Sequence, residues 1–405
     1  MKLLQINCVY KKDSTGKLVY VIHSGMLESG EESVVCYGRG EKLNDKNAFK
    51  TCGELYSKFN NLLSRFTGLM YGGCYFSTKK LIKIIKKQNP DIVHLHSING
   101  YFVNIYKLIE FLNKSKIKTV LTLHAEFMHT ANCGHALDCD KWKTGCGNCP
   151  RLKSETHSLF FDKTALSFKK MEKAFEGFLN LKVVSVSSWL KKRAEASPIL
   201  GDKEHLTVLN GVDTSIFYRR EDTKIIDSLK KENRKIVFHA TAFFSADKEH
   251  LKGGGYVISL AKRFLKEDSN IVFLIAGKHD KVENLPSNVI LLGNVTDQNS
   301  LAEYYSAADV TLLTSKKETF SMIVAESLCT GTPVVGFEAG APEEITIKEY
   351  SSFVPFGDED KIFEELKAWI YKEDIDKNAI SNSAKSKYSK ETMVEQYKEI
   401  YRSFL

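Results

Sequence analysis

No stretch of this sequence is apolar for long enough to cross a membrane, and none has the layout of a secretory signal. The opening residues, MKLLQINCVY, form an apolar run that is too short for such a signal. Nine cysteines are present, and without a signal they indicate reduced thiols rather than a disulfide framework. We therefore expect a cytoplasmic protein that can work at the inner face of the cell membrane.

The sequence also lacks internal repeats, low-complexity segments and any nucleic-acid-binding motif with interleaved aromatic residues. Lysine and arginine outnumber aspartate and glutamate by 58 to 50, which gives a net charge of +8. A basic balance favours partners that carry negative charge. With nucleic acid excluded, an anionic membrane face and phosphate-bearing substrates remain.

β-rich runs alternate with helical patterns in both halves of the 405 residues. This alternation is typical of α/β folds with parallel sheets, and the length suits two domains that each bury a core. We expect a first domain at 1–205 with a Cys-rich insertion at 125–157, a second domain at 206–385, and a last helix at 386–405. Ligand sites in such folds lie at the carboxyl ends of the strands.

One stretch, 315–337, combines an anion site with two carboxylates. A polar turn leads into an apolar helix that we expect to begin at Ser321, and a buried strand follows. Serine is a good helix cap, and the free N–H groups of a first helical turn can bind an anion. Glu318 before the helix and Glu326 inside it can accept hydrogen bonds from hydroxyls. The combination suits a nucleotide-sugar, whereas the plainer alternative is a loop glutamate and a salt-bridged helix glutamate.

Near the start of the chain, Gly16 lies in a turn expected between a strand at 2–8 and a helix that reaches about Leu27. Glycine at such a turn lets a ligand approach the backbone closely. The turn is not a P-loop, because the earlier glycine is missing and no Ser or Thr follows Lys17. This excludes a nucleotide triphosphatase of that type, and a plain tight turn is the alternative.

Three more polar side chains stand where α/β folds build sites. His96 and His124 end the matching runs DIVHLH and TVLTLH, and two histidines at the ends of neighbouring strands favour a site over a purely structural role. Lys252 directly precedes the glycines that open a helix. A cation there opposes the helix dipole unless an anion also binds, and an exposed loop lysine is the alternative.

Three further segments of the first domain have a predicted structure. Residues 38–73 contain several Gly and Asn residues and are predicted to be irregular. Residues 78–88 form a basic amphipathic helix, whose charges are either simply solvated or contact an anionic bilayer that holds a lipid-linked acceptor. A helix is expected at 160–178.

Four cysteines lie within the insertion at the spacing C-x5-C-x6-C-x2-C. Four thiolates can hold a zinc ion tetrahedrally, and such a filled site would be structural rather than catalytic. Packed free thiols or one redox pair are the alternatives. The four residues are Cys133, Cys139, Cys146 and Cys149.

Together these motifs resemble those of retaining GT-B glycosyltransferases of family four. The likeness covers nearly the whole chain and rests on the Glu318-x7-Glu326 spacing, on Lys252-Gly, and on NGVDTSIF at 210–217. The cysteine motif resembles a loop found in a subset of colanic-acid and exopolysaccharide enzymes. The resemblance implies two doubly wound Rossmann-like domains that face each other across a cleft, a hinge around 206–218, and a last helix that crosses back to the first domain.

The resemblance also implies the chemistry. It indicates transfer of a sugar, with retention, from a nucleotide-diphosphate sugar to a glycan or polyprenyl-linked acceptor in bacterial surface polysaccharide synthesis, with no metal required for catalysis. The catalytic residues are expected to be His124, Lys252 and Glu318. The donor-binding residues are expected to be Gly16, Gly277, Thr319, Phe320, Ser321, Met322 and Glu326.

Two positions depart from the pattern of that family. Ala125 follows His124 where the family usually has Asp, and no Arg precedes Lys252-Gly, so that Lys248 is the candidate substitute. Two other functions also fit the fold. One is a sugar-nucleotide epimerase, which changes the donor alone, and the other is a non-catalytic sugar-nucleotide-binding protein.

Overall fold

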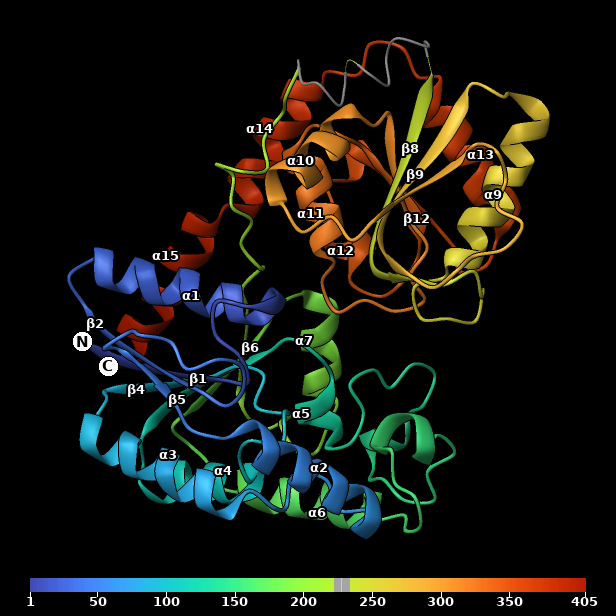
Figure 1. Cartoon of the computed structure of the whole chain (residues 1–405). Coiled ribbons are helices and arrows are strands. Elements are labelled where there is room, and N and C mark those ends of the chain that lie inside the picture. The colour runs from blue at the N-terminus through green and yellow to red at the C-terminus, as the bar shows by residue number, and fades with distance from the viewer. Residues whose placement is uncertain (222–226, 228–233) are drawn as a thin grey trace. The chain divides into compact units, whose positions relative to one another are not determined.

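The computed structural model describes residues 1–221, 227 and 234–405, and these divide into two compact units (Figure 1). The first unit comprises 1–209 and 393–405, and the second comprises 210–392. The expected boundaries after 205 and 385 lie four and seven residues before these divisions. Residues 222–226 and 228–233 lie outside the described part of the chain.

The first unit is built on a seven-stranded parallel sheet with the strand order β3-β2-β1-β4-β5-β6-β7. Its strands are β1 (Lys2–Asn7), β2 (Glu32–Tyr37), β3 (Ala48–Lys50), β4 (Ile92–Leu95), β5 (Lys118–Leu123), β6 (Leu181–Ser185) and β7 (Glu204–Thr207). Its helices are α1 (Asp13–Glu28), α2 (Glu54–Thr67), α3 (Tyr75–Gln88), α4 (Ile105–Lys114), α5 (Phe127–Thr130), α6 (Thr164–Phe175), α7 (Ser188–Glu195) and most of α15 (Lys390–Phe404).

The second unit has a six-stranded parallel sheet with the strand order β10-β9-β8-β11-β12-β13. Its strands are β8 (Lys235–Phe244), β9 (Ile271–His279), β10 (Val289–Gly293), β11 (Val310–Leu313), β12 (Val334–Phe337) and β13 (Ser351–Val354). Its helices are α9 (Gly254–Glu267), α10 (Gln298–Ala307), α11 (Met322–Cys329), α12 (Pro342–Ile345), α13 (Glu359–Ile370) and α14 (Lys377–Tyr388). The two parallel sheets confirm the α/β prediction.

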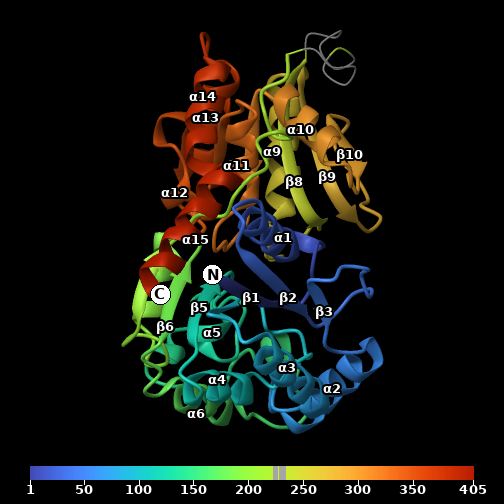
Figure 2. The ribbon, with the colours of Figure 1, turned by 90° about the vertical axis from the view of Figure 1, so that its left-hand side faces the viewer.

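The central strands are nearly continuous apolar runs because helices cover both faces of a parallel sheet. In the second unit Val237, Phe273 and Leu312 are fully buried, and they share one core with α9 and α13. In the first unit α15 packs its apolar face on the sheet beside α1 (Figure 2). Tyr397 and Tyr401 of α15 belong to that core together with Leu3 and Ile92.

The chain enters the second unit at residue 210 and leaves it at residue 392. Inside that unit, the entering and leaving segments contact each other. Val212 forms a parallel bridge with Ser389, and Lys390 Nζ lies 2.7 Å from Asp213 Oδ2. The NGVD motif therefore pairs with the residues that begin α15. In the described parts of the chain, no helix is both long and apolar enough to span a membrane.

Three predictions about local structure were wrong. The segment 38–73 is not irregular throughout, because it contains α2. The helix expected at 160–178 begins only at Thr164, and Phe160 and Phe161 before it are exposed. Gly16 does not lie in a turn, because α1 already begins at Asp13 and Gly16 packs against Val9.

Candidate functional site

Lys252 and Glu318 form an ion pair in the second unit. Lys252 Nζ donates to Glu318 Oε1 at 2.6 Å, and the side chains are 27% and 14% exposed. Glu318 is held by its backbone, since its N–H donates to Ala339 O at 2.9 Å and its carbonyl accepts from Ala341 N at 3.2 Å. The carboxylate therefore fixes the position of the ammonium group, and a polyanion that binds here would compete for the same cation.

Close backbone approaches place Lys252 at the amino end of α9. Gly253 has a φ of 61°, and a Cβ on it would lie 2.2 Å from Thr314 O. Thr314 Oγ1 in turn donates to Lys252 O at 2.9 Å. Only glycine fits this left-handed position against the end of β11. The lysine therefore stands between the free N–H groups of α9 and the loop that carries Glu318.

Ser321 precedes α11 but is not the helix cap that we predicted. Its backbone has φ 89° and ψ 92°, and its side chain makes no cap hydrogen bond within the described structure. Ser321 is 6% exposed, and its buried hydroxyl has no hydrogen-bond partner among the described residues. A strained non-glycine residue with an unsatisfied buried hydroxyl costs about 1–3 kcal/mol and is typical of functional sites.

The residues next to Ser321 are mostly buried. Thr319 and Phe320 are 8% and 3% exposed, while Met322 is half-buried and begins α11. They contribute backbone at the helix end rather than a large accessible side-chain surface. Lys252 thus lies in the loop before α9 and pairs with Glu318 in the loop before α11. The N–H groups of the first turn of α11 follow that second loop directly.

A cavity of about 190 Å³ lies at the carboxyl ends of β8, β9 and β10, beside α10 and α11. It brings together two predicted donor-binding residues, Gly277 and Glu326. A Cβ on Gly277 would lie 2.5 Å from Thr241 O, which explains the glycine. The lining residues are Ala240, Thr241, Ala242, Ala276, Gly277, Asn294, Val295, Leu301, Tyr305, Ile323 and Glu326.

Sequence reasoning missed two residues of this region. Tyr305 of α10 donates to Glu326 Oε2 at 3.4 Å and orients that carboxylate. His239 of β8 is 2% exposed, its Nδ1 lies 3.0 Å from Leu312 O, and its Nε2 has no partner in the part of the chain described. Burial, and to a lesser extent Lys252, lowers the pKa of His239 to about 4. His239 lies within β8 and not at its carboxyl end, so the rule that selected His96 and His124 did not select it.

In the first unit, His124 and His96 lie side by side, as their matching strand ends predicted. Gln5 Nε2 donates to Val19 O at 3.3 Å, so Gln5 Oε1 is the acceptor for His96 Nε2 at 3.1 Å. His96 Nδ1 must then accept a hydrogen bond from the N–H of His124 Nε2, 3.2 Å away. Burial lowers the pKa of His124 to about 4, so the imidazole is neutral near pH 7 and can position a ligand but not donate a proton as an acid.

Lys248, the candidate substitute for the missing arginine, and Glu126, two residues after His124, are bound to other partners. Lys248 forms an ion pair with Glu359, whereas Lys252 pairs with Glu318. The two lysines therefore do not share a partner. Glu126 is fully buried and lies 2.5 Å from Arg193 Nε. Burial alone would raise the pKa of Glu126, but His129 and Arg193 hold it below its ordinary value. Since Glu126 also accepts from Ala136 N at 2.7 Å, it anchors the Cys-rich insertion rather than serving as an acid.

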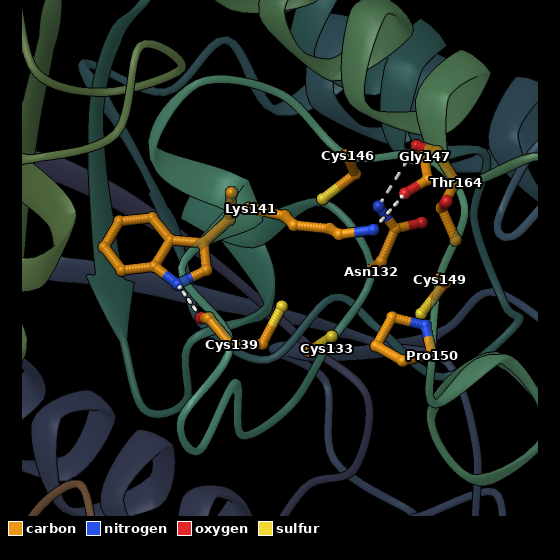
Figure 3. A pocket seen from close by; sticks show the side chains of 10 residues that line it. Asn132, Cys133, Cys139, Lys141, Cys146, Gly147, Cys149, Pro150 and Thr164 are labelled. Carbon is orange, nitrogen blue, oxygen red and sulfur yellow. Dashed lines mark hydrogen bonds between the residues drawn. The ribbon is translucent and has the colours of Figure 1, made fainter.

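The four cysteines of the insertion line one small cavity of about 20 Å³ (Figure 3). Lys141 Nζ closes part of the loop by donating to Gly147 O at 3.0 Å and Asn148 O at 2.7 Å. Burial raises the pKa of Cys133 to about 12 and that of Cys146 to about 11, so without a cation these groups are neutral thiols. Within the described residues, no group of three or more His, Cys, Asp or Glu side chains is arranged to hold a metal.

The structural zinc therefore stays a prediction, since metal binding would have to displace the thiol protons and draw the sulfurs together. If it is correct, purified protein contains about one zinc per chain, and a chelator lowers its Tm. Metal analysis of Cys146→Ser should then show loss of the zinc. Cys8→Ser, outside the insertion, should keep it. If the purified protein contains no metal and the chelator does not change its Tm, the interpretation as packed free thiols is favoured.

Comparison with known proteins finds similarity to glycosyltransferases. Residues 221–386 match the model of glycosyl transferases group 1. The chain is 23% identical over 371 residues to WcaC of Escherichia coli K12, assigned as a colanic acid biosynthesis glycosyl transferase, and covers 86% of each chain. It is 22% identical over 342 residues to the N-acetyl-alpha-D-glucosaminyl L-malate synthase of Bacillus anthracis, covering 80% of this chain and 78% of that one.

Solved structures share the fold over the whole chain. WaaG, a glycosyltransferase involved in lipopolysaccharide biosynthesis, gives a TM-score of 0.65 at 13% identity and covers 98% of this chain and 99% of its own. HepE of Anabaena in complex with UDP gives 0.63 at 15% identity and covers 100% of both chains. The fold is thus the GT-B fold of these glycosyltransferases. Over residues 221–386 the chain matches the glycosyl transferases group 1, family four, and over most of its length it is similar to WcaC.

Proposed function

We propose that this glycosyltransferase moves a sugar, with retention, from a nucleotide-diphosphate sugar to a glycan or polyprenyl-linked acceptor of a bacterial surface polysaccharide. The observation that carries the proposal is the Lys252–Glu318 pair beside the amino end of α11. Relatives named for colanic acid and lipopolysaccharide biosynthesis support the pathway class, and the UDP complex of HepE supports the donor class.

In the proposed reaction, the bond between the sugar C1 and the diphosphate oxygen breaks and a bond to the acceptor hydroxyl oxygen forms. Negative charge builds up on the diphosphate oxygen as its bond to C1 breaks, and the acceptor hydroxyl passes its proton to that departing oxygen. Lys252 and the N–H groups of α11 are already in place to stabilise that charge. Because a cation and helix dipoles supply this stabilisation, we propose that the transfer needs no divalent metal.

The carboxylates and the histidine take the remaining roles. Glu318 is released from Lys252 when the diphosphate binds and accepts hydrogen bonds from the sugar hydroxyls. Glu326, oriented by Tyr305 in the 190 Å³ cavity, binds the ribose. His124 belongs to the first unit and is proposed to position the transferred sugar as a neutral imidazole. The backbone beside Gly16 is proposed to lie against the donor.

Donor binding can be tested apart from catalysis. A thermal-shift screen with a panel of nucleotide-sugars should identify the donor. Glu326→Ala should then weaken donor binding by about tenfold, because it removes a charged hydrogen bond of roughly 1.5 kcal/mol. Glu303→Ala, on the neighbouring helix α10 but outside the cavity, should leave affinity unchanged. Equal affinities in all three proteins would contradict the ribose assignment.

The epimerase alternative makes a different product. Incubation of the donor with the enzyme but without acceptor should leave the sugar configuration unchanged, and addition of a glycan or lipid-linked acceptor should release nucleoside diphosphate. An altered sugar in the absence of acceptor would favour the epimerase. Donor binding with neither product would favour the non-catalytic binding protein.

A further inference from the structure

Helix α2 is amphipathic in the reverse of the usual sense. A surface helix normally turns its apolar stripe to the core. The buried residues of α2 are instead polar: Ser57, Asn60 and Ser64. Its large apolar side chains are between 44% and 82% exposed: Leu55, Phe59, Leu62, Leu63 and Phe66. Such a helix leaves its hydrophobic surface without a partner in the described structure.

Hydrogen bonds fix this orientation. Ser57 Oγ donates to Gly100 O at 3.1 Å, and Asn60 Oδ1 accepts from Cys74 N at 2.7 Å. Turning the helix to bury its apolar stripe would break both bonds and leave buried polar groups unsatisfied. The outward direction of the leucines and phenylalanines is therefore built into the fold.

Neighbouring segments extend the exposed surface on both sides of α2. The Phe76 ring lies 6.1 Å from Tyr56, and Tyr56 Oη accepts from Phe76 N at 3.3 Å. At the other end the Phe66 ring lies 5.8 Å from Phe160, where Leu159 N donates to Arg65 O at 2.8 Å. We call this surface the apolar face, and it consists of the five exposed α2 residues with Tyr75, Phe76, Leu159, Phe160 and Phe161.

The charge around the apolar face selects its partner. Residues 54–88 contain seven basic side chains, at positions 58, 65, 79, 80, 83, 86 and 87, and one acidic side chain, Glu54. Glu54 already pairs with Arg39 at 3.2 Å. A second copy of this chain would bring like charges together, whereas anionic lipid headgroups would neutralise them at about 1 kcal/mol per basic residue. An exposed apolar patch of this extent on a soluble domain marks an interaction site.

We infer that the apolar face inserts into the boundary between headgroups and acyl chains of an anionic bilayer, while the basic residues of α2 and α3 contact lipid phosphates. α2 lies at the margin of the first unit in both views (Figure 1, Figure 2). The sequence suggested α3 for membrane contact, but Leu81 and Ile85 of α3 are buried, so α3 supplies charge and α2 supplies insertion. This inference does not depend on the proposed reaction.

Vesicle flotation tests the inference with the full chain and no sugar ligand. The protein should float with phosphatidylcholine vesicles that contain phosphatidylglycerol, and binding should weaken at high salt and with phosphatidylcholine alone. The triple variant Phe59→Ser, Leu62→Ser, Phe66→Ser should bind at least about tenfold more weakly, since each substitution removes a side chain that contributes 1.5–3 kcal/mol when buried. Leu179→Ser, at a side chain that is 91% exposed elsewhere in the unit, should bind like the wild type.

Two further measurements keep the outcomes distinct. The charge variant Arg65→Glu, Lys79→Glu should lose vesicle binding with an unchanged Tm. This variant tests the inference even if the triple variant does not fold. Sedimentation without lipid should show the same mass for the wild type and the variants. Undiminished flotation of both variants would overturn the inference, and so would a wild-type dimer that the triple variant abolishes, since the face would then belong to a second copy. A failure to detect glycosyl transfer would contradict the proposed function but not the inference that the apolar face inserts into a bilayer.

Discussion

Substitution of Lys252 by alanine is expected to lower kcat by a factor on the order of 100 or more, which corresponds to about 2.7 kcal/mol. The ammonium is the cation that lies next to Glu318, at the amino end of α9 and beside the loop that begins α11. Charge grows on the leaving diphosphate as its bond to the sugar breaks, so the loss should appear mainly in kcat. Steady-state kinetics with a matched donor and acceptor measure it.

The control for this substitution removes a comparable ion pair that has no role in the site. Lys367 Nζ of α13 lies 2.9 Å from Glu267 Oε2 at the carboxyl end of α9, opposite the end that carries Lys252, and both side chains are about half exposed. Lys367→Ala should therefore retain full turnover and a similar Tm, because exposed ion pairs contribute little. If Lys252→Ala turns over as fast as Lys367→Ala, the proposed electrostatic mechanism is wrong.

The sheets and the positions of most site residues could be predicted because they depend on local patterns. Alternating apolar runs and turns define parallel strands, and the carboxyl ends of those strands are where ligands bind. His96 therefore lies beside His124, and Lys252 beside Glu318, although the two residues of each pair are far apart in the sequence. The cavity that joins Gly277 to Glu326 follows from the same rule.

What could not be predicted depends on tertiary contacts. Lys248 could not be excluded as the missing arginine until its partner Glu359, more than 100 positions away, was known. A serine before a helical pattern predicts a capping side chain, and nothing in the sequence indicates the φ of 89° that Ser321 has instead. α2 was missed although its apolar residues recur at helical spacing, because flanking Gly and Asn residues suggested a loop.

Stability is expected to fall steeply below pH 6.5, before most carboxylates are protonated. His239 is 2% exposed, and burial holds its pKa near 4, against an ordinary value of 6.5. Above pH 6.5 both the folded and the unfolded imidazole are neutral, so the free energy of unfolding does not change. Between pH 6.5 and 4 the unfolded chain binds a proton that the folded chain excludes, which costs about 1.4 kcal/mol per pH unit for each such histidine.

The histidines of the first unit act in the same direction. Burial lowers the pKa of His124 to about 4 and those of His94 and His96 well below 6.5. His94 is also bonded to Tyr401 Oη at 2.6 Å, so its protonation would disturb the contact between α15 and the sheet. Together these groups make acid unfolding below pH 6.5 steeper than a single histidine could.

One variant isolates the contribution of His239. His239→Asn keeps an N–H donor near Leu312 O but removes the titrating ring, so the slope of unfolding free energy between pH 6.5 and 5.5 should fall by about 1 kcal/mol per pH unit. His279→Asn, at an exposed position at the end of β9, should leave that slope unchanged. Urea unfolding at several pH values measures both. Because burial of a neutral imidazole is the cause, identical slopes in the two variants would mean that His239 takes up its proton over the same pH range in the folded and unfolded chains.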